Sequence, residues 1–208
     1  MKNLIACLFF TAISSLFAVC LLNAQNPPVS GNWELIPELT DEFDEGINSD
    51  KWHTNDPKWV GRVPSYFESN NVSVKDGMLS LTCRKTNDQD KPPFSSEGSY
   101  THATAAFKSK TKVKYGYFEV ATKASNSKYY NSFWLYDNTD NDLTEIDVYE
   151  IVASKNYLGR TAHLFYAKSD YEGTVDNHIE KQQQVGSWID GWEYEDGFFA
   201  DYHVYGIK

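Results

Sequence analysis

After residue 24, the apolar residues of this chain occur in short runs, and this pattern limits the possible folds more than any other feature of the sequence. The runs are rich in β-branched and aromatic residues and are separated by Gly, Asn, Asp and Pro. No repeat, heptad pattern or long amphipathic helix breaks the series. Short runs of this kind, punctuated by turn residues, are typical of antiparallel all-β domains. The sequence therefore predicts an all-β sandwich.

The clearest local signal is a hairpin within residues 71–83. Val72 and Val74 alternate with polar residues before Asp76-Gly77, and a second alternating run, Met78–Cys83, follows the pair. Asp-Gly between two such runs favours a tight turn, because both residues tolerate positive φ angles. Further strands are predicted at residues 107–109, 113–124, 132–136, 145–152, 161–167 and 202–207.

Two segments are predicted to be loops. Lys91–Ser99 contains two consecutive prolines, which cannot donate hydrogen bonds within a sheet. Asp137–Asp142 offers several oxygen ligands, but it lacks the turn glycine and the spaced closing glutamate of a calcium-binding loop. The chain also has neither an HExxH motif nor a cluster of Cys and His. The sequence therefore predicts neither a metal ion nor another cofactor.

The first 24 residues are predicted to be a secretory signal peptide. Lys2 precedes the apolar stretch Leu4–Leu22, and the small residue Ala24 marks a cleavage site. A transmembrane anchor is the main alternative, because the apolar stretch is nearly long enough to span a bilayer. A lipid-modified Cys20 is another. Cleavage predicts a domain at residues 25–208 that is secreted, periplasmic or held at the cell surface, without a membrane segment of its own.

Cleavage would leave a single cysteine in the mature chain. Cys7 and Cys20 lie in the signal segment, whereas Cys83 closes the second run of the predicted hairpin. No intrachain disulfide can then form, so packing has to stabilise the fold. Within an alternating strand, Cys83 is expected to be buried as a small apolar residue.

The charge balance excludes one broad class of function. The chain has 19 Lys and Arg against 29 Asp and Glu, which gives a net charge of -10 and an isoelectric point near 4.9. Proteins that bind nucleic acid present a basic face. We therefore expect no nucleic-acid partner, and a polyanion would need a local cationic pocket.

Three acidic residues, Glu145, Asp147 and Glu150, share the segment 143–152. The β-branched and aromatic residues between them favour a strand over a helix. In a regular strand Glu145 and Asp147 point to one face, and Glu150 is out of phase. A single bulge at Val148-Tyr149 would return Glu150 to the face of the other two acids.

Such a group of carboxyls suits hydrolysis of a glycosidic bond. In a retaining glycosidase one carboxylate attacks the anomeric carbon and a second carboxyl, about 5 to 5.5 Å away, protonates the leaving oxygen. Asp147 lies between the two glutamates, where it can share a proton or a hydrogen bond with Glu145. Crowding of this kind separates the carboxyl pKa values and keeps one acid protonated. The alternative is a solvated strand face that is acidic, although like charges along one face repel each other.

The string Glu145-Ile-Asp-Val-Tyr-Glu150 resembles the catalytic motif of glycoside hydrolase family 16 in its bulged form, with two residues between Asp147 and Glu150. Further motifs similar to those of the family follow in the expected order over residues 33–208: Asp41–Gly46 with Lys51-Trp52, Lys114–Glu119, Asn131–Leu135 and Tyr202–Gly206. Within the family, Trp59–Phe67 and Lys123–Ser125 look most like the β-agarase and porphyranase branch.

The resemblance implies a role for each acid. Glu145 would be the nucleophile, Asp147 its helper and Glu150 the general acid/base. Trp134 would form an aromatic floor under the sugar beside the scissile bond, and Trp59 would be a further stacking platform. Flat aromatic rings match the apolar C–H faces of sugars. An ordinary core position is the alternative for both tryptophans.

Two more residues are candidates for contacts with the substrate. Arg62 would hold a sugar hydroxyl or a sulfate group, with a structural salt bridge as the alternative. His163 has alternating spacing within Thr161–Phe165, and the family often places a histidine on the strand after the catalytic one. A structural histidine is the alternative at that position.

The resemblance also implies the architecture and the substrate. We expect a concanavalin-like β-sandwich jelly roll of two curved antiparallel sheets, whose concave face forms a groove for a polysaccharide. The expected activity is endo cleavage of β-linkages in a marine galactan, agar or porphyran, with retention of configuration, by a monomer. A β-glucanase of laminarin or lichenan type and a non-catalytic carbohydrate-binding jelly roll are the alternatives. Family domains normally continue beyond the Tyr202–Gly206 strand, so the domain is expected to be incomplete at its C-terminus and to lack part of the family's structural calcium site.

Overall fold

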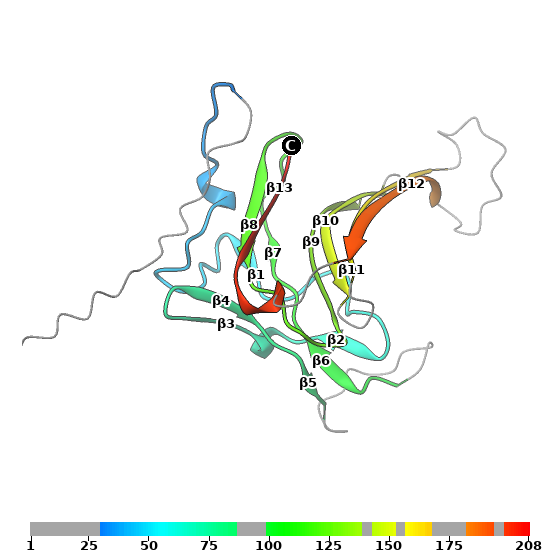
Figure 1. Ribbon diagram of the computed structural model, residues 1–208. Helices are drawn as coiled ribbons and strands as arrows, with labels where there is room; N and C mark the ends of the chain where they lie inside the picture. Colours follow the sequence, from blue (N-terminus) through cyan, green and yellow to red (C-terminus); the bar gives the residue numbers. More distant parts are fainter. Residues whose placement is uncertain (1–29, 87–98, 139–142, 153–156, 168–181, 194–197) are drawn as a thin grey trace, which may run out of the picture. The chain divides into compact units, whose positions relative to one another are not determined.

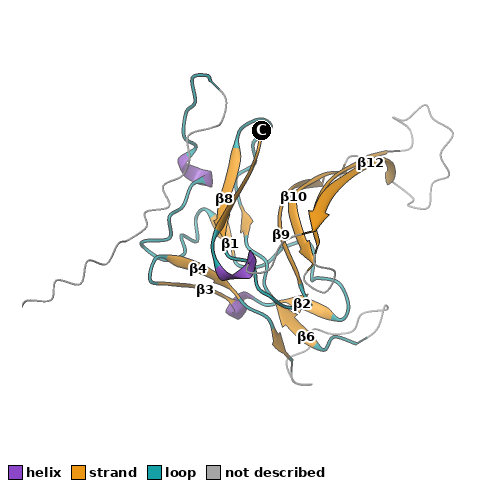
Figure 2. Cartoon of the chain, viewed as in Figure 1, coloured by secondary structure: helices purple, strands orange, loops and turns teal. Residues whose placement is uncertain are grey.

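The computed structural model of the protein describes residues 30–86, 99–138, 143–152, 157–167, 182–193 and 198–208. The predicted signal segment 1–24, most of the predicted loop Lys91–Ser99 and residues 139–142 of the predicted loop Asp137–Asp142 lie outside these ranges. Asp137 and Asn138 belong to a strand, so the loop prediction is wrong for these two residues. Over the described residues the chain forms strands and short 3₁₀ helices but no α-helix, which confirms the all-β prediction (Figures 1 and 2). No helix in the described ranges is long and apolar enough to cross a membrane.

The chain divides into two compact units, and the first is Val29–Gly116. Its elements are η1 (Pro37–Leu39), β1 (Trp52–His53), β2 (Ser65–Phe67), η2 (Ser69–Asn71), β3 (Val72–Lys75), β4 (Met78–Leu81), β5 (Arg84–Lys85), β6 (His102–Thr104) and β7 (Lys108–Ser109). The strands pair as β2-β6-β5, β1-β7 and β3-β4, with only β2 and β6 parallel among these pairs. A small core of Tyr66, Tyr100 and Ala103 lies beside the β2-β6 pair. The many Gly, Pro and Asn residues of this region keep its strands short.

β3 and β4 form the predicted hairpin. Lys75 pairs with Met78, and Asp76 and Gly77 between them have φ angles of 53° and 71°. Both angles lie in the left-handed region that a two-residue type I′ turn requires. The prediction drawn from the Asp-Gly pair is therefore confirmed.

The prediction that Cys83 is buried is wrong. β4 ends at Leu81, and Cys83 is an exposed free thiol in the segment that leads to β5. Thr82 holds the end of β4 in place, because its backbone N–H and its hydroxyl both donate to the carbonyl oxygen of Asn71, at 2.9 and 3.1 Å. Alternation between inward and outward side chains applies only while the chain remains a paired strand, and here the strand stops two residues too early.

The second unit is Tyr117–Lys208. Its elements are β8 (Phe118–Thr122), β9 (Tyr130–Asn138), β10 (Leu143–Val152), β11 (Tyr157–Ala167), β12 (Gln182–Glu193), η5 (Phe198–Ala200) and β13 (His203–Ile207). β12-β11-β10-β9 form one antiparallel sheet, visible as adjacent arrows in Figure 1, and β8 pairs with β13. Its core contains Ala124, Tyr149, Ile151 and Leu158. Ile151 and Leu158 lie opposite each other on β10 and β11 and are 0% and 1% exposed, so the face of the sheet that carries them is the buried one.

Several strands differ from the sequence prediction. The short strands β1, β2, β5 and β6 were not predicted, and β9, β10 and β11 begin two to four residues earlier than predicted. β12 was not predicted, because its sequence begins with three glutamines and includes two glycines, which hide any alternation. Its backbone is a strand because it pairs along β11 over its whole length. The predicted strand 113–124 begins only at Phe118, after Gly116.

Candidate active site

The bulge predicted at Val148-Tyr149 is present in β10. Along β9, the partners of Asp147 and Tyr149 are consecutive residues, so Val148 is the extra residue. Val148 and Tyr149 are both 5% exposed, which means that β10 buries two successive side chains at this point. Glu150 therefore returns to the face of the sheet that carries Glu145 and Asp147. The bulge prediction is confirmed.

Neighbouring strands surround the three acids with further side chains. Residues that lie directly opposite each other in an antiparallel pair project to the same face of the sheet. Glu145 lies between Tyr136 of β9 and His163 of β11, Asp147 between Trp134 and Thr161, and Glu150 between Ser132 and Gly159. We call these nine residues the acidic face.

Asp147 is the buried member of the three acids, with a side chain that is 5% exposed. Burial raises its pKa, and the charges of Glu150 and Glu145 raise it further, to about 7. Both glutamates must lie near Asp147 to exert this effect. A large fraction of the Asp147 carboxyls is therefore protonated at neutral pH and can donate a hydrogen bond to a carboxylate.

His163 belongs to the same cluster. Its Nε2 atom lies 3.5 Å from Oδ2 of Asp147, and its side chain is 25% exposed. The ligating atoms of Glu145, Asp147 and His163 all lie within 4.8 Å of one another. In the described part of the chain, this trio is where a divalent cation would find ligands, and the same spacing suits exchange of a proton. That no metal is needed stays a prediction, as does contact of His163 with substrate.

Trp134 lies beside Asp147 on β9 and is half-buried. Its ring packs at a tilt against that of Tyr136, with centroids 5.0 Å apart. The indole is thus on the acidic face and not in the apolar core of Ile151 and Leu158. Its position fits an aromatic floor for a sugar, which stays a prediction.

Trp59 and Arg62 belong to the other unit, Val29–Gly116. Trp59 is 38% exposed, and the guanidinium carbon of Arg62 lies 6.0 Å from the centroid of its ring. The Phe67 ring lies nearly perpendicular to the indole, at 85°, with the ring centroids 5.1 Å apart. Gly61 between the two has a φ of 112°, and a Cβ there would lie 2.9 Å from the Cα of Tyr66, so glycine is required at this turn.

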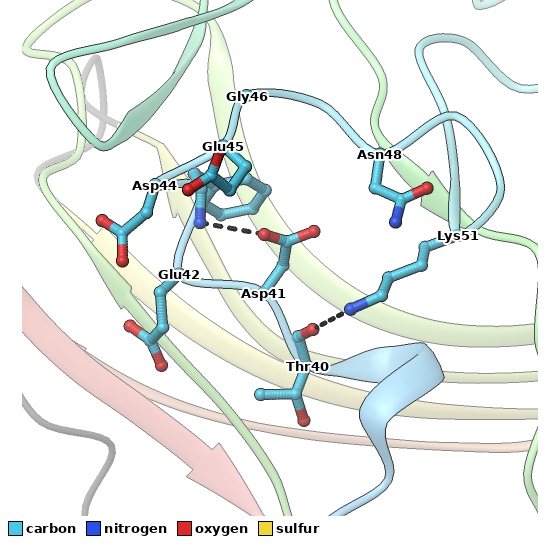
Figure 3. A pocket seen from close by; sticks show the side chains of 9 residues that line it. Thr40, Asp41, Glu42, Asp44, Glu45, Gly46, Asn48 and Lys51 are labelled. Carbon is cyan, nitrogen blue, oxygen red and sulfur yellow. Dashed lines mark hydrogen bonds between the residues drawn. The ribbon is translucent and has the colours of Figure 1, made fainter.

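A hollow in the same unit is formed by the segment Thr40–Lys51, shown in Figure 3. Oδ1 of Asp41 accepts a hydrogen bond from the backbone N–H of Phe43 at 2.9 Å, and Oδ2 accepts one from Nε1 of Trp52 at 2.8 Å. Nζ of Lys51 donates to the carbonyl oxygen of Thr40 at 2.8 Å. These groups hold the segment's own shape, so we assign the hollow a structural role.

Sequence reasoning missed some members of the acidic face. Tyr136 and Thr161 were not candidates, although each lies two residues from a residue that was, Trp134 or His163. Period-two alternation along β9 and β11 could have found both. The same alternation would have found Ser132, two residues before Trp134, whereas Gly159 lies before the predicted strand 161–167 and is placed beside Glu150 by the register between strands.

We expect Asp147→Asn to stabilise the protein at pH 8 while it lowers activity. The pKa of Asp147 in the folded protein is about 7, well above the ordinary aspartate pKa of 3.8, so the folded state binds more protons than the unfolded state between those values. The free energy of unfolding therefore falls as pH rises through this window. The asparagine amide does not titrate, so the substitution removes this fall. Urea unfolding should show a gain of about 1 to 3 kcal/mol at pH 8 and almost none at pH 4.

The matched control is Asp50→Asn, which changes an exposed acid of the other unit. It should alter the free energy of unfolding by less than about 0.5 kcal/mol at both pH values. A gain for Asp147→Asn that is equal at pH 4 and pH 8 would contradict the burial of a shared proton at this position.

This chain is similar to known proteins over most of its length. Residues 33–207 match the family model of the β-porphyranase A–D GH16 domain. β-Porphyranase B of Phocaeicola plebeius is 34% identical over a match that covers 88% of this chain and 64% of its own length. The crystal structure of porphyranase B from Zobellia galactanivorans has a TM-score of 0.65 and 26% identity over 84% of this chain and 67% of that one.

A more distant structure shows the same fold. The κ-carrageenase from Pseudoalteromonas carrageenovora, solved with an oligotetrasaccharide of κ-carrageenan, has a TM-score of 0.66 and 21% identity over 88% of this chain and 72% of that one. The chain spans about three fifths of the length of curated relatives that it matches, 61% and 63%. The structural matches confirm the predicted jelly roll.

Proposed function

This chain belongs to glycoside hydrolase family 16, in the group of the β-porphyranase A–D domains, and from that premise we propose that it is a retaining endo-hydrolase of a galactan. The observation that supports the proposal most directly is the bulge in β10, which gives Glu145, Asp147 and Glu150 one common face. Without the bulge, Glu150 would point into the core, and only Glu145 and Asp147 would share the face.

The proposed reaction has two displacements. Glu145 attacks the anomeric carbon while Glu150 gives its proton to the leaving oxygen, which breaks the glycosidic bond and forms a covalent glycosyl ester. Glu150, now a carboxylate, then takes a proton from water, and that water releases the sugar from Glu145. Two inversions at one carbon leave its configuration unchanged.

Asp147 supports Glu145 through both steps. Its pKa of about 7 allows it to hold a proton between the two glutamates and to donate a hydrogen bond to the Glu145 carboxylate. His163, 3.5 Å from the Asp147 carboxyl, offers a second site for that proton. Asp147 can thus donate a hydrogen bond to the Glu145 carboxylate before the attack and release it when the ester forms and that negative charge is lost.

The substrate we propose is a galactan of agar or porphyran type. Relatives carry the names β-porphyranase and β-agarase. An exposed indole beside a guanidinium, as in Trp59 and Arg62, suits a sugar ring with a negatively charged substituent, because the ring stacks and the cation binds the anion. This local cationic group favours porphyran over neutral agarose, and a local group outweighs the net charge of -10, which by itself would favour a neutral galactan.

The test is reducing-end release from porphyran, agarose, κ-carrageenan, laminarin and lichenan. We expect products from porphyran or agarose, none above background from laminarin and lichenan, and β-anomers as the first products in a proton NMR time course. Products from laminarin alone would favour the β-glucanase alternative. Binding to agarose or porphyran without any product would favour the non-catalytic alternative.

A further inference from the structure

Two glycines lie in a row beside Glu150, one on the acidic face and one on the strand next to it. Gly159 of β11 is directly opposite Glu150, and Gly191 of β12 is directly opposite Gly159. Neither glycine has a positive φ, so the backbone does not require glycine at these positions. Their common property is the missing side chain, which leaves a bare strip across two strands beside Glu150.

The ring of Tyr157 occupies that strip. A Cβ at Gly159 would lie 3.0 Å from Cε1 of Tyr157, and a Cβ at Gly191 would overlap the phenol oxygen of Tyr157 and lie 2.5 Å from the carbonyl oxygen of Leu158. Tyr157 is two residues before Gly159 on β11, so its side chain starts from the same face. Tyr157 is half-buried, which leaves part of it open to solvent.

The role proposed for Glu150 indicates which part of the substrate would contact the Tyr157 ring. A general acid contacts the leaving oxygen, so the sugar that leaves must pass next to Glu150. Trp134 occupies the β9 side of β10, whereas Tyr157 and the glycine strip occupy the β11 and β12 side. The two aromatic surfaces therefore flank the carboxyls on opposite sides.

We propose that Tyr157, lying on the strip formed by Gly159 and Gly191, is the platform on which the leaving-group sugar binds. This inference rests on the proposed function, and within it on Glu150 as the general acid. A flat phenol ring offers a C–H face of the sugar a stacking surface with little conformational entropy to lose. The glycines keep the ring low on the sheet, where a side chain would lift it into the path of the substrate.

A tyrosine that covers glycines can also serve the sheet alone, by packing where the glycines leave a gap. The two roles differ in which substrates they affect. A leaving-group platform matters only when a sugar leaves, whereas a structural role affects every substrate and the melting temperature alike. The experiment therefore compares a galactan oligosaccharide with an aryl glycoside of the same sugar, whose leaving group is a phenol.

We expect Tyr157→Leu to lower kcat/KM on the oligosaccharide about tenfold, mainly through KM, and to change it less than about twofold on the aryl glycoside. Tyr157→Phe keeps the ring and should restore the oligosaccharide rate. Tyr202→Leu is the matched control, because Tyr202 is an exposed tyrosine of the same unit outside the acidic face. It should leave both rates unchanged.

Equal losses on both substrates, or no loss on the oligosaccharide, would overturn the role of Tyr157. The wild-type protein separates this failure from that of the proposed function. If it cleaves both substrates, the proposed function stands whatever the variants show. If it cleaves neither, the proposed function is overturned and the inference about Tyr157 with it.

Discussion

Glu145→Ala is expected to lower kcat on the galactan on the order of 10⁴- to 10⁶-fold, the scale of losing a covalent nucleophile. The alanine leaves a space where the carboxylate lay, opposite His163 on the acidic face. Azide is small enough to enter that space and attack the anomeric carbon in a single displacement. Activity should therefore return in part with azide, and the product should be an α-glycosyl azide, inverted relative to the β-linked substrate.

The fold of Glu145→Ala should be intact, because Glu145 is outside the buried core of its unit. Glu38→Ala removes an exposed glutamate of η1 and serves as the control, with unchanged turnover. Retained turnover in Glu145→Ala without azide, or a β-glycosyl azide as its product, would exclude Glu145 as the nucleophile.

Glu150→Ala is expected to lower kcat/KM on the galactan by about 10²- to 10⁴-fold, the usual contribution of a positioned general acid. The loss should shrink greatly on an aryl glycoside with an acidic phenol, because that leaving group needs little protonation. Azide should again restore turnover, now by attack on the ester formed at Glu145, so the product keeps the β configuration.

The configuration of the azide product in each of the two glutamate variants tests which glutamate is the nucleophile and which is the general acid. A glycosyl azide of inverted configuration identifies the mutated carboxyl as the one that binds the sugar, and one of retained configuration identifies it as the one that transfers the proton. Loss of activity alone does not distinguish these two roles. If both variants gave the same anomer, the roles assigned to Glu145 and Glu150 would be wrong even though both were needed for turnover.

Much of the site could be predicted because its chemistry lies on one strand. The spacing of Glu145, Asp147 and Glu150 conflicts with a regular strand, and a single bulge is the smallest change that resolves the conflict. The structure has that bulge at the predicted residues. The Asp76-Gly77 turn was predictable for the same reason, since its backbone preference is local.

Features that depend on other strands were not predictable in the same way. β12 is a strand because β11 pairs with it, although its glutamines and glycines give no alternating pattern. Cys83 was expected to continue an alternation that stops at Leu81, where Thr82 bonds back to Asn71. Strand ends are set by such single contacts, which composition does not encode.

The cross-strand neighbours of the acids show the same limit. Trp134 and His163 were candidates through resemblance, and the register places them next to Asp147 and Glu145. Tyr157 was not a candidate, because its place depends on glycines in two different strands. Nothing in the sequence of β11 alone indicates that a second glycine on β12 lies under the same ring.

The bulge that aligns the acids has a consequence for how this protein tolerates change over evolution. Tyr149 is one of the two residues at the bulge, and its ring packs against that of Tyr205 on β13 in the core of the unit, with the ring centroids 4.4 Å apart. A substitution at either tyrosine would change the orientation of Glu150 without contacting it, so we expect the two positions to covary among homologues. Libraries that vary these two tyrosines and keep the three carboxylates should contain almost as large a fraction of inactive variants as libraries that vary the acids themselves.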